Sequence, residues 1–163
     1  MVTVRGRDVW TVPLEPGAQP RPLLAEAFTE RDACVSPDGR WLAYVSDESG
    51  RPEISVRSLT GTPRRLVVSS EGGDQPVWRH DGRELFFADR DGRLHGVIVR
   101  ADARNGLAFS IARRLDVPAL TERHWGTTYE VSADGRRVYF PHALADQPPR
   151  EFGVILDWAA LFE

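Results

Sequence analysis

Short apolar runs separated by turns rich in aspartate and glycine define the pattern of this chain. Three apolar runs each follow an Asp-Gly-Arg sequence: residues 41–45 after Asp38, residues 85–88 after Asp81, and residues 138–140 after Asp134. Asp-Gly suits a tight hairpin turn, because aspartate can bond its own backbone two residues on and glycine accepts a positive φ. The pattern therefore predicts a β-hairpin at each of these three places.

The hairpins belong to a repeat that returns every 43 to 53 residues. A second mark recurs in phase with the turns: "RPLL", "RRLV" and "RRLD" place Leu23, Leu66 and Leu115 in matching positions, 43 and then 49 residues apart. The longer unit absorbs an insertion around "RADARNG", residues 100–106. Two unrelated marks that recur in phase indicate a structural repeat.

Each repeat predicts four short strands, which in the best-formed unit are residues 33–36, 41–45, 54–57 and 65–68. The second strands are apolar on consecutive residues, as expected where both faces of a sheet are covered. Third strands such as "EISVRS" alternate, as if half exposed. Four strands in a period of this length are typical of a β-propeller blade, so the fold class is predicted to be all-β.

The number of repeats predicts only part of a propeller. "DVWTVPL" matches "EISVRSL", so residues 1–28 supply the outer strands of an incomplete blade, followed by blades at 29–71 and 72–119 and a last blade with a closing tail at 120–163. The total is about three and a half four-stranded antiparallel blades in a single domain, whereas a closed propeller has four or more. Open strand edges make self-association through them possible. One hypothesis is that two copies pair into a larger closed ring, and the favoured alternative is a truncated chain that folds as an open arc.

Composition and charge exclude several classes of function. The net charge is −3, so no basic surface for nucleic acid is expected. All 21 basic residues are arginine, which excludes a lysine-dependent phosphate loop or Schiff base within the chain. No apolar run reaches the length of a membrane span, so direct membrane insertion is not expected. The single cysteine, Cys34, is predicted to be a small core residue.

Nothing in the pattern predicts catalysis, a cofactor or a metal site. The four histidines lie in different segments, and neither a G-x-S-x-G nor an H-E-x-x-H sequence occurs. His80 is expected in a solvated turn, and His95 is expected to face outward from a third strand. "ADRDGR", residues 88–93, begins like a calcium loop but lacks the remaining ligands.

The candidate binding surface is the rim of the propeller, where the segments that precede each first strand converge. These segments are residues 29–32, 72–75 and 122–126. A protein or peptide ligand is expected here, with an acidic group meeting Arg31, Arg123 and His124 and with Trp125 as a stacking anchor. The alternative is ordinary loop chemistry with Trp125 packed between blades. The candidate ligand-binding residues are Arg31, Asp32, Asp74, Gln75, Arg123, His124 and Trp125.

The repeat sequences themselves carry a specific resemblance to known propellers. "FTERDACVSPDGRWLAYVSDESGRPEISVRSLTG", residues 28–61, resembles the WD-repeat-like propeller unit of TolB and of the C-terminal propellers of bacterial serine/threonine kinases. "TTYEVSADGRRVYF" resembles the last repeat of the kinase propellers, and the ending "FGVILDWAALFE" is similar to their closing strand and tail. Two turns depart from the pattern: Arg79-His80 replaces Ser-Pro, and Ala133 replaces Pro.

The resemblance implies a non-enzymatic sensing or interaction module of a bacterial kinase, on the extracytoplasmic side of the membrane. Two alternatives remain. One is the propeller subdomain of a prolyl-oligopeptidase-like peptidase, and the other is an independent TolB-like periplasmic scaffold.

Overall fold

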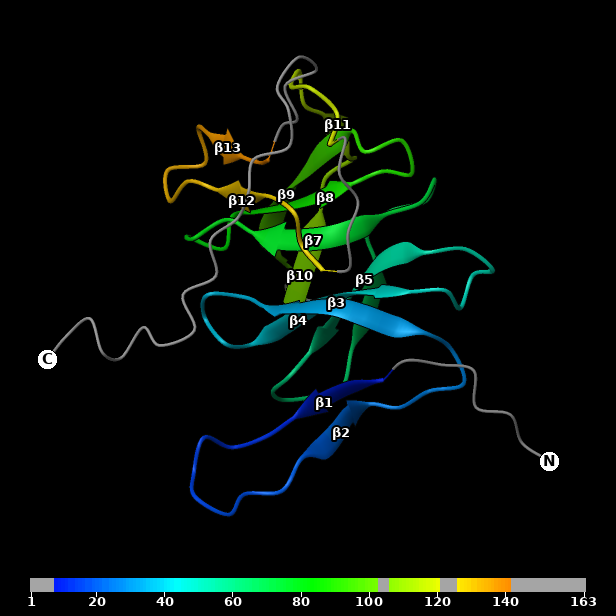
Figure 1. Cartoon of the computed structure of the whole chain (residues 1–163), viewed down its shortest axis with the longest axis vertical. Coiled ribbons are helices and arrows are strands. Elements are labelled where there is room, and N and C mark those ends of the chain that lie inside the picture. The colour runs from blue at the N-terminus through cyan, green and yellow to red at the C-terminus, as the bar shows by residue number, and fades with distance from the viewer. Residues whose placement is uncertain (1–7, 103–105, 121–125, 142–163) are drawn as a thin grey trace, which may run out of the picture.

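Four antiparallel sheets follow one another along the chain and lie one on the next (Figure 1). The computed structural model describes residues 8–102, 106–120 and 126–141, which form strands, turns and connecting segments without a helix. Within these residues there is accordingly no helix that could cross a membrane. The predicted all-β class and the stacked sheets of a partial propeller are confirmed.

The second sheet has the four strands that the repeat predicts. Its first hairpin closes where the Ser36 amide donates to the Trp41 carbonyl at 2.8 Å. Asp38 accepts a hydrogen bond from the Arg40 amide at 3.1 Å, and Gly39 has a φ of 72°. The Asp-Gly turn therefore works as its sequence predicts. The sheet consists of β3 (Glu30–Val35), β4 (Trp41–Ser46), β5 (Glu53–Ser58) and β6 (Arg65–Val67).

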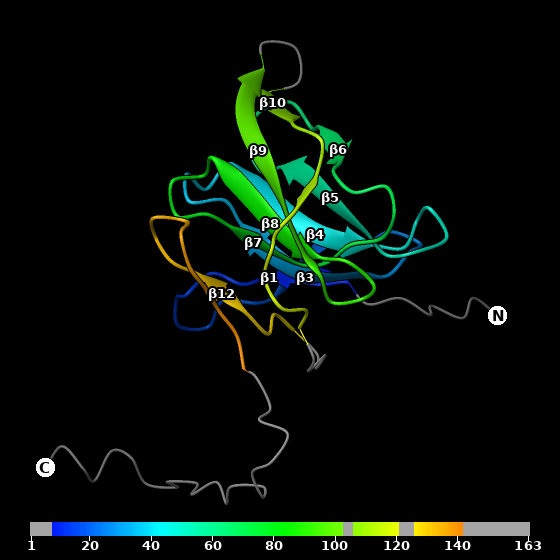
Figure 2. The same cartoon turned by 90° about the horizontal axis from the view of Figure 1, so that it is seen from above.

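The third sheet is larger than the repeat predicts. Its third strand, β9 (Leu94–Asp102), runs beyond β8 (Glu84–Ala88). The first half of β9 pairs with β11 (Arg113–Arg114), and its second half pairs with β10 (Gly106–Phe109) (Figure 2). On either side of the insertion, β9 and β10 thus pair beyond the end of β8, and the predicted fourth strand is reduced to two residues. The strands are β7 (Asp74–Trp78), β8 (Glu84–Ala88), β9 (Leu94–Asp102), β10 (Gly106–Phe109) and β11 (Arg113–Arg114).

Two-stranded sheets lie on either side of this pair. β1 (Val9–Thr11) pairs with β2 (Arg21–Leu24), and β12 (Glu130–Val131) pairs with β13 (Val138–Tyr139). The first of these sheets packs on β4 through Leu24, which is buried.

The core lies between the sheets, because the second strands are buried on both faces. Alternate residues of β4 point in opposite directions: Trp41, Ala43 and Val45 pack toward β8 and β9, whereas Leu42 and Tyr44 pack toward β2. β8 repeats the arrangement, with one set of side chains in the core shared with β4 and β5 and the other facing β12. This two-sided burial is how propeller blades stack.

His95 differs from its prediction. Instead of facing outward it is half-buried, with Nε2 2.9 Å from Asp89 Oδ2 and its ring stacked on Phe87 at a centroid distance of 5.4 Å. The cause is strand register, because Phe87 and His95 are cross-strand partners and their side chains share one face of the sheet. Cys34 packs beside the core, where burial raises the pKa of its thiol to about 12.

Candidate functional site

The first strands of the two large sheets meet at the predicted rim. Arg31 in β3 reaches across to Asp74 at the start of β7, and its Nη2 donates to Asp74 Oδ2 at 3.1 Å. Its Nη1 also pairs with the carboxylates of Asp74 and Asp32. All three side chains are less than a quarter exposed. One arginine therefore joins two sheets from residues that lie 43 positions apart in the sequence.

Both first strands carry a β-bulge at this point. Asp32 has a φ of 50° and Gln75 a φ of 53°, values that side chains other than glycine seldom adopt. The strand register shifts between Arg31 and Cys34 in one sheet and at the corresponding place in the other. The bulges turn the rim side chains toward the neighbouring sheet, and such strained positions are concentrated at functional sites.

Burial and the shared arginine shift the pKa values of Asp32 and Asp74 in opposite directions. Burial raises the pKa of Asp32, and a hydrogen bond with Asp74 adds to the increase. Together they outweigh the charge and hydrogen bond of Arg31, which lower this pKa. Burial acts in the same direction on Asp74, but the hydrogen bond and charge of Arg31 outweigh it and lower the pKa of Asp74. Of the two carboxyl groups, Asp74 is therefore the one whose charged form Arg31 stabilises more strongly.

Gln75 links the sheet of β7 to the last described sheet, as Arg31 links the second and third sheets. Its Oε1 accepts hydrogen bonds from the Thr128 amide at 2.8 Å and from the Thr128 hydroxyl at 2.9 Å. Its carbonyl accepts one from the Tyr129 hydroxyl at 2.9 Å. The predicted residues Arg31, Asp32, Asp74 and Gln75 are thus brought together at the junctions between sheets. Arg123, His124 and Trp125 lie outside the described residues, and the ligand-binding role of all seven stays a prediction.

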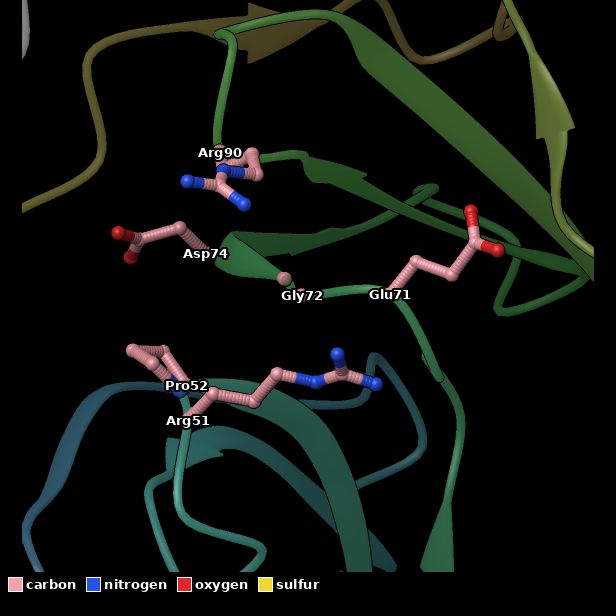
Figure 3. A pocket seen from close by; sticks show the side chains of 7 residues that line it. Arg51, Pro52, Glu71, Gly72, Asp74 and Arg90 are labelled. Carbon is pink, nitrogen blue, oxygen red and sulfur yellow. The ribbon is translucent and has the colours of Figure 1, made fainter.

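A pocket of about 330 Å³ opens at the same rim, between the segment before β5 and the segment before β7 (Figure 3). Three lining residues, Gly72 to Asp74, belong to the predicted rim segment 72–75, and Asp74 is the one among the candidate ligand-binding residues. Arg51 and Arg90 were missed, although both lie in the turn between the second and third strands of a repeat, which reaches the same end of the sheet as the rim segments. The lining residues are Arg51, Pro52, Glu71, Gly72, Gly73, Asp74 and Arg90.

A larger cavity of about 600 Å³ adjoins this pocket and shares Glu71, Gly72 and Arg90 with it. It continues past His95 to Ile111, which is 94% exposed. In the part of the chain that the structure describes, no group of three or more histidine, cysteine, aspartate or glutamate side chains is placed to hold a metal ion. The groups available for binding at the rim are arginine side chains, backbone groups and carboxylates that are already paired.

Stacked antiparallel sheets joined at their first strands define a segment of a β-propeller, and sequence comparison agrees. No family model matches the chain. It is 45% identical over 60 residues to the Tol-Pal system protein TolB of Alcanivorax borkumensis, which covers 35% of this chain and 14% of that protein. It is 37% identical over 59 residues to dipeptidyl aminopeptidase BI of Pseudoxanthomonas mexicana, covering 35% of this chain and 8% of the relative. The chain is similar to TolB over about a third of its length, and the matched residues span a small fraction of either relative.

Structural comparison supports the fold alone. A crystal structure from Bacteroides uniformis, provisionally assigned as a 6-phosphogluconolactonase, matches with a TM-score of 0.53 and 16% identity. The match covers 80% of this chain and 40% of that structure. The architecture described above therefore corresponds to part of a larger solved fold.

Proposed function

We propose that this chain is a non-catalytic module that binds a protein or peptide at the rim formed by the segments before β3, β7 and β12. The observation that carries the proposal is the 330 Å³ pocket between two sheets at that rim. Arg51 and Arg90 line opposite sides of it, and the Arg31–Asp74 pair fixes the adjoining strands. Pockets of this size with a few converging polar groups are typical of binding sites.

Within its parent protein, the module serves as the sensing or interaction part of a bacterial serine/threonine kinase, on the extracytoplasmic side of the membrane. The resemblance of residues 28–61 to the propellers of such kinases supports this assignment. The kinase role and the location both rest on resemblance.

A second candidate is the propeller subdomain of a prolyl-oligopeptidase-like peptidase, which the similarity to dipeptidyl aminopeptidase BI favours. A third is an independent TolB-like periplasmic scaffold. The neighbouring coding sequence separates them. Kinase motifs and a membrane span upstream support the first, an α/β-hydrolase downstream supports the second, and upstream blades with an export signal but no kinase support the third.

Peptide binding at the rim can be tested by panning a library of random linear peptides against the chain. Pro52→Trp places a bulky ring on the pocket wall, whereas Pro37→Trp makes the same change in the β3–β4 turn, at the other end of β3. Enriched peptides are expected to bind Pro52→Trp at least about tenfold more weakly and Pro37→Trp as they bind the parent. The absence of enriched peptides, or equal binding to both variants, would contradict rim binding. Robust hydrolase or kinase turnover would contradict the non-catalytic assignment.

A further inference from the structure

Arg51 is held in place at the edge of the pocket while much of its side chain stays accessible. Its Nε donates to Glu53 Oε1 at 2.7 Å, and its Nη2 donates to the Ser70 carbonyl. The side chain is nevertheless 58% exposed. A guanidinium has five N–H donors, so the two bonds fix its orientation and leave others to meet an anion.

Glu53 organises this wall of the pocket. Its carboxylate is buried and accepts hydrogen bonds from Arg51, from the Ser69 hydroxyl and from the Gly72 amide, the last at 3.0 and 3.1 Å to its two oxygens. The Ser69 hydroxyl oxygen in turn accepts from the Ile54 amide at 2.8 Å. One carboxylate therefore fixes both the arginine and the loop that forms the floor. Glu53 is a positioning residue, since its hydrogen bonds are all made inside the protein.

The floor of the pocket is backbone pressed onto β5. The Gly73 amide donates to the Pro52 carbonyl at 3.0 Å. A Cβ at Gly73 would lie 2.6 Å from Ile54 Cγ1 and 2.8 Å from Ser69 Oγ, so no side chain fits there. A rigid, backbone-lined floor lowers the cost of ordering the site when a ligand binds.

The two arginines that line the pocket come from opposite walls. Figure 3 shows Arg90 on one side and Arg51 with Pro52 on the other, with the Gly72 backbone between them. The Asp74 and Glu71 side chains extend toward opposite ends. An anionic group placed centrally would meet both guanidinium groups, and carboxylates pair with arginine through two parallel hydrogen bonds.

The adjoining cavity favours a peptide over a small ion. It continues from the shared residue Arg90 past His95 to the exposed Ile111, and it adds about 600 Å³ to the 330 Å³ of the pocket. A free phosphate or carboxylate ion would occupy only the space beside the arginines. An extended chain would continue along the second cavity and bring an apolar side chain against Ile111.

We propose that, given the rim binding proposed above, this pocket recognises the carboxylate of an acidic side chain within an extended peptide. Arg51 and Arg90 are its direct contacts, and the Glu53 hydrogen-bond network positions Arg51. The proposal adds two binding residues to the rim and states the chemistry of the ligand: an aspartate or glutamate flanked by residues that lie along the second cavity.

The test is a titration of the ¹⁵N-labelled 163-residue chain with blocked peptides, followed by the amide signals of Gly72 and Gly73. The probes are acetyl-Ala-Asp-Ala-amide, its asparagine counterpart, and inorganic phosphate. The aspartate peptide is expected to shift both signals in a saturable manner and to bind at least about tenfold more tightly than the asparagine peptide, because only the carboxylate forms charge-assisted hydrogen bonds.

Arg51→Gln and Arg90→Gln are each expected to weaken binding of the aspartate peptide at least about tenfold. The matched control is Arg83→Gln, an arginine with a side chain that is 83% exposed, in the turn at the other end of β8; its affinity should equal that of the parent. Arg90→Gln keeps the test decisive if Arg51→Gln perturbs the Glu53 network, because Arg90 belongs to a different turn, after β8, on the opposite wall of the pocket.

Equal binding of the two peptides, unchanged affinity in both arginine variants, or the absence of any shift would overturn the proposal. Saturable phosphate binding without binding of the aspartate peptide would overturn the choice of a peptide and leave a small anion as the ligand. The panning experiment decides rim binding separately. Enriched peptides that depend on Pro52 but lack acidic residues would retain the proposed function and refute this inference.

Discussion

The ion pair between Arg31 and Asp74 links two sheets through a single residue on each side. Asp74→Asn is expected to lower the free energy of unfolding at pH 7 by about 1–3 kcal/mol, because Arg31 loses a charged acceptor in a partly buried place. The pKa of Asp74 is lowered in the folded state, so its contribution is complete above the ordinary aspartate pKa and is lost as the pH falls below it. Urea unfolding at pH 7 and pH 3 should show the difference shrinking in acid.

The control for this substitution is Asp91→Asn, since Asp91 pairs with Arg93 at 2.6 Å but is 57% exposed. An exposed pair contributes about 0–1 kcal/mol, so the control should change stability little. Equal effects of the two substitutions would mean that the rim pair is no more than a surface contact.

Glu30 is a buried residue whose ionisation is unfavourable in the folded state. It is 1% exposed, and neither carboxylate oxygen makes a hydrogen bond of good geometry with the described residues, although the Glu26 backbone partly opposes the rise in its pKa. Burial raises its pKa, and the nearby Glu26, Asp8 and Asp47 carboxylates add to the increase. The folded state therefore resists ionisation, and stability is greatest below the ordinary glutamate pKa and falls as the pH rises through the raised value.

Glu30→Gln removes the ionisation and keeps the shape. The difference in stability between Glu30→Gln and the parent is expected to grow in favour of the variant from pH 4 to pH 8, because only the parent must ionise a buried carboxyl group. Thermal unfolding across that range measures the difference. The exposed Glu71→Gln is the control and should show no such trend. A constant difference between Glu30→Gln and the parent would show that Glu30 ionises freely in the folded state.

Among the elements, the last described sheet depends on Gln75 for its attachment. Gln75→Leu keeps an apolar body of similar size but leaves the Thr128 amide without its acceptor, at a cost of about 1–3 kcal/mol. Amide hydrogen exchange in β12 and β13 should accelerate, while that in β4 and β5 stays as in the parent. Gln19→Leu is the control, since exposed Gln19 makes only a local bond to the Gly17 carbonyl. Unchanged exchange in β12 would place the attachment in apolar packing alone.

The strands that the sequence predicts well are those set by local signals. Asp-Gly turns and consecutive apolar residues locate β3 to β6 within three residues at each end, because both signals depend on neighbours in the chain. The β9–β10 hairpin was missed, since the insertion at residues 100–106 breaks the repeat that guided the prediction. His95 was misplaced because its stacking on Phe87 depends on cross-strand register.

The candidate site was predictable only as a region. The repeat places the segments before the first strands at one end of the sheets, which identified the rim and Asp74. It does not show that Arg31 would be engaged by Asp74 of the next sheet, since that contact depends on how sheets stack. Arg51 and Arg90 become recognisable only when the turns between second and third strands are placed against the rim.

At the scale of the whole molecule, the β1–β2 sheet leaves apolar surface uncovered. Trp10 is 57% exposed, Val12 47% and Leu14 100%. In the described residues β1 pairs with β2 alone, so its other edge carries backbone groups able to pair with another strand. Exposed apolar side chains beside an open edge favour association, so the isolated chain is expected to form dimers or larger species as concentration rises.

Trp10→Lys should shift this equilibrium toward monomer, because a lysine beside the open edge opposes both apolar contact and strand pairing. Sedimentation velocity over a concentration series measures the change. Ile98→Lys is the control, since Ile98 is 47% exposed in β9, which belongs to a different sheet from β1. A parent chain that stays monomeric at every concentration would contradict association altogether. Association that Trp10→Lys leaves unchanged would assign it to another face, of which the last sheet with its exposed Tyr139 is the next to test.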